Sequence, residues 1–194
     1  MKIRPGVPAT RPRRFPIAFA LFATLLVSCS HPNNKGASEQ IPGDIPENLR
    51  VNGPSIGVHA RGFQVYKCVA DVNRKLSWTL KEPDAKFENA AGLTGTHYAG
   101  PTWRASDGSL VRGHKLQEQA SPEPNAVPWL LLEAASHEGS GKLSSVTFIQ
   151  RIHTSGGVAP AVGDAKAGDE VRVNYSADYV FYGPGATTQP ANPR

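Results

Sequence analysis

The sequence predicts an all-β fold, a single-domain sandwich or barrel of about seven or more short antiparallel strands. Hydrophobic residues alternate with a period of two in several runs, and Gly and Pro punctuate the gaps between them. No window shows a convincing long period of 3.6 residues, which a helix would require. Short strands with closely spaced turn signals are typical of sandwiches and barrels.

The clearest strand covers residues 171–182. One face of this strand carries Val171, Val173, Tyr175, Ala177, Tyr179 and Phe181. The other face is polar as far as Asp178 and becomes apolar at Val180 and Tyr182. This change predicts a strand that passes from solvent into a second packed layer.

Weaker runs of the same kind predict the remaining strands. Residues 129–135 are also compatible with a helix by propensity alone. Hairpin turns are expected at residues 106–109 and 138–141, where glycine supplies the positive φ that such turns need. The runs cover residues 62–69, 76–80, 95–99, 109–114, 129–135 and 146–153.

The N-terminus has the features of a bacterial lipoprotein signal peptide. A basic segment precedes an apolar run at residues 15–27, which is shorter than a membrane-spanning helix requires. Leu26-Val27-Ser28-Cys29 closes the run with the residue order at which lipoprotein precursors are cut and acylated. We expect a signal peptide at residues 1–28 and lipidation, including palmitate, at Cys29, which would anchor the protein to the membrane.

Processing also changes the charge. Residues 1–28 hold five of the 21 Lys and Arg residues and no Asp or Glu, which leaves 16 basic and 16 acidic residues. The mature chain is formally neutral, so a nucleic-acid partner is not expected. Ser30 after the cysteine, rather than Asp, predicts the outer membrane, with the protein facing the periplasm.

Composition divides the mature chain into three parts. Residues 29–48 contain the lipidated cysteine and a polar stretch rich in Pro, Asn, Gly and Ser, which predicts a disordered tether. Residues 49–182 are long enough for one β domain with its own core. Residues 183–194 contain three prolines and no hydrophobic pattern, so we expect a disordered tail.

Several segments, taken in order, resemble a bacterial and fungal family named domain of unknown function 3455 (DUF3455). The resemblance implies an exported protein and implies no activity, substrate or cofactor. Relatives often carry a second cysteine shortly after the Gly-Gly turn, and the resemblance implies a disulfide between it and the position of Cys68. In this chain the corresponding region reads Ala161-Val-Gly-Asp-Ala-Lys166 and has no cysteine. We therefore expect Cys68 to be a buried free thiol. The matching segments are residues 63–68, 95–103, 124–134, 148–157 and 175–182.

The densest mixture of aromatic and polar residues lies at residues 97–104. Tryptophan and tyrosine offer flat apolar surface with a hydrogen-bonding group, which suits sugars and other envelope ligands. The alternative is that these aromatic residues belong to the core. The candidate ligand contacts are His97, Tyr98, Trp103, Arg104 and Trp129.

A metal site is the second candidate. His97 and His114 flank the turn at Asp107, and these three side chains would converge across a hairpin to hold zinc or copper. No histidine lies in a known metal-ligand spacing. On the later run, Arg151 and His153 are expected to share a strand face, with Arg151 as a structural ion-pair partner or, as the alternative, in a binding role.

These observations predict a lipid-anchored envelope protein that is a non-enzymatic binding module for a small molecule, a glycan or a protein. Two alternatives remain open. The first is a metal-dependent hydrolase or oxidoreductase that uses His97 and His114, and the second is a structural subunit of an envelope complex. The sequence identifies no cofactor.

Overall fold

The computed structural model describes residues 45–189, and nearly all of their regular structure is β. The signal peptide, Cys29, most of the expected tether and residues 190–194 lie outside the described residues. The described part contains no helix long and apolar enough to cross a membrane. Its elements are η1 (Glu47–Leu49), β1 (Val51–Asn52), β2 (Ser55–Ala70), β3 (Leu76–Glu88), β4 (Thr94–Tyr98), β5 (Thr102–Ala105), β6 (Leu110–Gln119), β7 (Trp129–Glu138), β8 (Phe148–Gly156), β9 (Glu170–Tyr182) and β10 (Thr187–Thr188).

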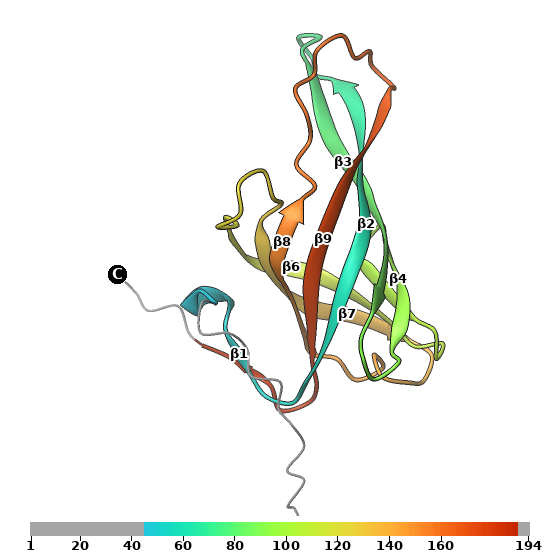
Figure 1. Ribbon diagram of the computed structural model, residues 1–194, viewed down its shortest axis with the longest axis vertical. Coiled ribbons are helices and arrows are strands. Elements are labelled where there is room, and N and C mark those ends of the chain that lie inside the picture. The colour runs from blue at the N-terminus through green and yellow to red at the C-terminus, as the bar shows by residue number, and fades with distance from the viewer. Residues whose placement is uncertain (1–44, 190–194) are drawn as a thin grey trace, which may run out of the picture. The chain divides into compact units, whose positions relative to one another are not determined.

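Strands β2 to β9 form a closed antiparallel barrel in chain order (Figure 1). Each strand pairs with the next, and β9 returns to pair with β2 over 13 residue pairs, from Ser55↔Tyr182 to Lys67↔Glu170. The prediction of an all-β sandwich or barrel is therefore confirmed, and each of the seven runs predicted from the alternation overlaps a strand, with ends that differ by at most two residues where a run extends past its strand. Residues 129–135 belong to β7, so the helical alternative there is wrong.

Three strands continue past the barrel as an arm, which projects at the top of Figure 1. Strand β2 pairs with β3 as far as Ala70↔Leu76, whereas β3 meets β4 only at residues 85–88. On the other side, β9 pairs with β2 to Glu170 but leaves β8 at Tyr175↔Gly156. The arm is therefore a three-stranded sheet in the order β3–β2–β9.

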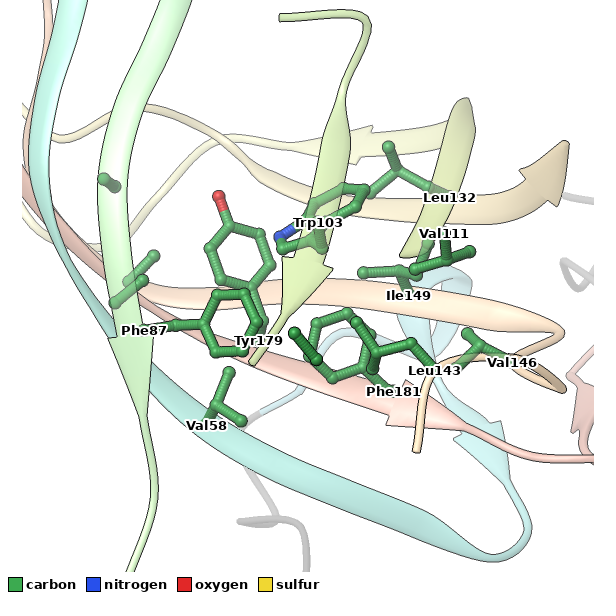
Figure 2. Close-up of a cluster of buried hydrophobic side chains, with 14 of the residues drawn as sticks. Val58, Phe87, Trp103, Val111, Leu132, Leu143, Val146, Ile149, Tyr179 and Phe181 are labelled. Atoms are coloured by element: carbon green, nitrogen blue, oxygen red, sulfur yellow. The ribbon is translucent and has the colours of Figure 1, made fainter. Parts of the chain in front are cut away.

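The barrel interior combines large aromatic side chains with small residues (Figure 2). Alanine and glycine on the inward faces leave room for rings from the opposite wall, as small barrels require. At Gly62, for example, an added Cβ would lie 2.5 Å from the Cα of Ala85 on the neighbouring strand. The large side chains inside are Phe87, Trp103, Tyr175, Tyr179 and Phe181.

A second hydrophobic cluster covers the outside of strands β7, β8 and β9. Val180 and Tyr182 face this cluster and are buried, which confirms the predicted passage of the last long strand into a second layer. The N-terminal segment supplies the cover, because Ile45, Leu49 and Val51 are almost completely buried there. Gln150 fixes this segment by donating a hydrogen bond from Nε2 to the Leu49 carbonyl.

Both expected boundaries of the domain need correction. Residues 45–48, assigned to the tether, contain the buried Ile45 and part of η1. Residues 183–189, assigned to a disordered tail, return to the fold, because β10 pairs with β1 through Val51↔Thr188 and Asn52↔Thr187. The polar composition of both segments gave no pattern that predicts ordered structure. Only a few apolar side chains anchor the first segment, and backbone pairing holds the second.

Candidate functional site

The segment that the sequence marked as a binding site is divided between the core and the surface. His97 on β4 and Trp103 on β5 occupy paired positions, and their rings stack with centroids 4.4 Å apart. Both are buried, with exposed fractions of 3% and 1%. Tyr179 packs its ring against both of them at centroid distances of 5.1 and 5.2 Å. His97 and Trp103 are therefore packed in the core, as the alternative for this segment expected.

Burial also fixes the protonation state of His97. Loss of solvent around the ring lowers the pKa of His97 to about 3, since the charged form is costly in an apolar core. The neutral ring donates a hydrogen bond from Nδ1 to the Thr102 carbonyl at 2.9 Å. At neutral pH this side chain is an uncharged packing group.

The other predicted contacts fall in two different places. Tyr98 and Arg104 lie on the outer face, where Arg104 Nε donates a 3.4 Å hydrogen bond to the Tyr98 hydroxyl. Trp129 is buried in the second cluster, with its ring edge-on to His153 at 5.4 Å. Trp129 is therefore also a core residue, and of the five candidates only Tyr98 and Arg104 lie at the surface together.

The predicted metal set of His97, Asp107 and His114 is not assembled. The Asp107 carboxylate accepts hydrogen bonds from the Ser109 amide and hydroxyl and from the Lys142 amide, which lower its pKa. His114 lies exposed, 3.4 Å from Glu133. Within residues 45–189, no group of three His, Cys, Asp or Glu side chains has an arrangement that would hold a metal ion. Because strand register separates them, the prediction of this metal site is wrong.

A histidine–aspartate–histidine group on the outer face was missed from the sequence. Asp178 on β9 accepts 2.7 Å and 2.9 Å hydrogen bonds from Nδ1 of His59 and Nδ1 of His153 respectively. The three residues come from neighbouring strands, 119 and 25 positions apart. A signal was present in the sequence, because Asp178 is the last polar residue on its face of β9 and directly precedes the apolar positions Val180 and Tyr182.

His153 also overturns the expected facing of β8. Its φ of 47° is rare for a residue with a side chain, and the pairing of β8 with β9 shifts between Ile152 and Ser155. The alternation of faces breaks at this point. His153 consequently turns outward to Asp178, while Arg151 remains on the inward face beside Tyr179, its partner in the register.

Arg151 is the charged residue at one end of the barrel interior. Its Nε and Nη2 donate hydrogen bonds of 3.0 and 2.8 Å to the Pro128 carbonyl. Within the described part of the chain it forms no ion pair with a carboxylate, so the expectation of a structural ion pair is wrong. Its charge influences the pKa values of His97, Tyr66, Tyr175 and Tyr179, which places it near all four.

Buried polar atoms lie near this arginine. The Trp103 Nε1 and the Gln64 Nε2 are buried without a hydrogen-bond partner, and the buried hydroxyls of Tyr175 and Tyr179 interact with each other and, for Tyr179, with Arg151. Burial raises the pKa values of both tyrosines, so their hydroxyls stay protonated and able to donate. Figure 2 shows the nitrogen-bearing edge of Trp103 turned toward Tyr179. We call Gln64, Trp103, Arg151, Tyr175 and Tyr179 the donor cluster.

The polypeptide closes over the donor cluster at residues 126–128 and 156–157. The Val127 amide bonds to the Gly156 carbonyl, Thr154 donates to the Val127 carbonyl, and the Tyr66 hydroxyl donates to the Gly157 carbonyl at 2.6 Å. Gly157 has a φ of 86°, and an added Cβ would lie 2.9 to 3.1 Å from atoms of Tyr175, Val127 and Gln64. Only glycine fits this close approach.

Comparison with known proteins gives one match. The family model described as "Protein of unknown function (DUF3455)" matches residues 51–183, which include all of the barrel strands. No curated protein and no solved structure matches the chain. Because the matched region covers well over half of the sequence, the chain belongs to the DUF3455 family.

Proposed function

We propose that this protein is an exported, lipid-anchored envelope protein whose barrel is a non-enzymatic binding module. Its site is the donor cluster, where a small ligand accepts hydrogen bonds inside the barrel. The observation that carries the proposal is the group of buried hydrogen-bond donors without partners around Arg151.

Energetics support a ligand at this position. A buried polar group left without a hydrogen bond costs about 1–3 kcal/mol, so most such groups in folded proteins are paired with protein, water or a ligand. Two groups without a partner, the Trp103 Nε1 and the Gln64 Nε2, lie near the buried hydroxyls of Tyr175 and Tyr179, and the three aromatic side chains are at most 4% exposed. An occupant that accepts hydrogen bonds would recover much of this cost.

The location of the cluster favours a small molecule over a glycan or a protein. Recognition of those larger partners relies on exposed aromatic residues, and Trp103 and Trp129 are both buried. An enzyme that uses a metal at His97 and His114 is not supported, because these residues do not come together.

The membrane address is proposed from the sequence. Lipidation at Cys29 would hold the mature protein at the outer membrane, with the chain between Cys29 and Ile45 leading to the barrel in the periplasm. A barrel tethered in this way would sample small molecules of the periplasm.

Native mass spectrometry tests the binding function. The mature lipoprotein, expressed from its full gene and purified in mild detergent without metal or chelator, should carry a reproducible extra mass of small-molecule size. Arg151→Gln should lose this mass, because the substitution removes the charge beside the donors.

Arg104→Gln is the matched control, since Arg104 is an exposed arginine of the same barrel. It should retain the extra mass. A wild-type protein without extra mass, or an Arg151→Gln variant that keeps it, would contradict the proposal.

A further inference from the structure

We infer that the ligand held by the donor cluster is a small molecule with a single carboxylate group. This inference rests on the proposed function and specifies its ligand.

The charge of the cluster is unbalanced. Arg151 is always protonated and lacks a carboxylate partner in residues 45–189. The acidic residues on the strands around it are engaged elsewhere: Asp84 pairs with Arg172 on the outside, and Asp178 pairs with its two histidines. A ligand with one negative charge would neutralise the site.

The unpaired atoms donate rather than accept. The indole nitrogen of Trp103 and the amide nitrogen of Gln64 have no acceptor function, and the tyrosine hydroxyls are protonated. A site of this character suits a group that only accepts hydrogen bonds. An ionised carboxylate has two oxygens with about four accepting positions, whereas a neutral amide would bring two donors of its own.

The geometry of Arg151 leaves donors for such a group. Nε and one Nη2 hydrogen bond are already used on the Pro128 carbonyl, which fixes the plane of the guanidinium. Arg151 also donates to the Tyr179 hydroxyl, so two of its five N–H groups remain for a ligand. Arginine binds carboxylates through paired donors of this kind.

The charge also separates a carboxylate from a phosphate. A phosphate monoester carries nearly two negative charges at neutral pH and has three strongly accepting oxygens. Arg151, held at the Pro128 carbonyl, is the one basic side chain among the five residues of the donor cluster. One arginine matches one carboxylate.

The indole signal of Trp103 provides the readout. The mature lipoprotein in detergent, dialysed extensively and labelled with ¹⁵N at its tryptophans, has three indole resonances, and Trp103→Phe assigns the one of interest. Acetate and benzoate should shift this resonance in a saturable manner, while acetamide and benzamide should not.

Two variants test the assigned roles. Arg151→Gln should weaken acetate or benzoate binding at least ~10-fold, since it removes a charge-assisted pair of hydrogen bonds. Tyr179→Phe removes only one hydroxyl, keeps the ring packing and should weaken binding by roughly 3- to 10-fold. Arg104→Gln should bind as the wild type does. If Arg151→Gln does not fold, as judged by the dispersion of its other indole signals, Tyr179→Phe decides alone.

The possible outcomes distinguish the carboxylate inference from the proposed binding function. Equal binding of the carboxylates and their amides, or a co-purifying ligand that is neutral, would overturn the carboxylate inference and leave the binding function intact. A protein with no extra mass and no response to any of the four probes would overturn both.

Discussion

At the scale of residues, burial decides the chemistry of this protein. His97, Trp103 and Trp129 are residue types that commonly bind ligands, but each is enclosed by the fold. The residues left with unpaired hydrogen-bonding capacity are instead Arg151 and the buried donors near it. A polar side chain therefore becomes a candidate for function through its missing partner rather than through its type.

The buried His97 should make stability depend on pH. Its folded pKa of about 3 lies below the unfolded value of about 6.5, so its contribution to stability is fully present above pH 6.5 and is lost as the pH falls toward 3. Between pH 7 and 4.5 the loss should amount to about 3 kcal/mol, at roughly 1.4 kcal/mol per pH unit.

Urea unfolding at several pH values, compared between the wild type and His97→Phe, measures this effect. The variant keeps an aromatic ring against Trp103 but cannot be protonated, so the unfolding free energy of the wild type should fall by about 3 kcal/mol relative to that of the variant between pH 7 and 4.5. A difference that is constant from pH 7 to 4.5 would contradict the burial of a neutral imidazole.

At the scale of elements, short irregular segments position side chains and cover hydrophobic surface, as the long strands do. The distortion of β8 at His153 keeps Arg151 inside the barrel and sends His153 outside. Asp107 ties the β5–β6 turn to the loop after β7 through the Lys142 amide, and Gly141 leaves space for its carboxylate. The N-terminal segment closes the second hydrophobic layer over β7 to β9.

Because the N-terminal segment covers the second hydrophobic layer, Leu49→Ala should strongly lower the stability of the fold. Leu49 is fully buried, so the substitution should lower the free energy of unfolding by about 2 to 5 kcal/mol. Glu47→Ala, on the exposed side of the same 3₁₀ turn, should change it by about 0.5 kcal/mol or less. Urea unfolding of the mature protein measures both. Similar small effects in the two variants would show that the segment does not contribute to the folded core.

At the scale of the whole molecule, the sequence predicts a lipid anchor at Cys29, ahead of the folded barrel. The two cysteines of the chain allow a matched test of this address. In a bacterial host supplied with labelled palmitate, Cys29→Ala should abolish incorporation and Cys68→Ala should retain it, because Cys68 is buried in the described domain. Incorporation that persists in Cys29→Ala would contradict lipidation at this residue.

Local sequence was sufficient for much of the fold. The period of two predicted seven of the strands, and the change of character at Val180 predicted the second layer. The four-residue β5 was missed because too few residues alternate to form a pattern, and β1 and β10 are shorter still. The tether and tail boundaries were wrong because polar segments gain order from contacts with distant residues.

The sequence by itself determined the all-β class, the approximate strands and the expected address, since each depends on hydrophobic character within a few consecutive residues. Only the tertiary structure decided which polar residues share a site. Closure of the barrel and the register between strands bring Gln64, Trp103, Arg151 and Tyr175 together, although they are far apart in the chain. The positive φ of His153 decides which side chains of β8 face inward, and the strand's alternation gave no warning of that break.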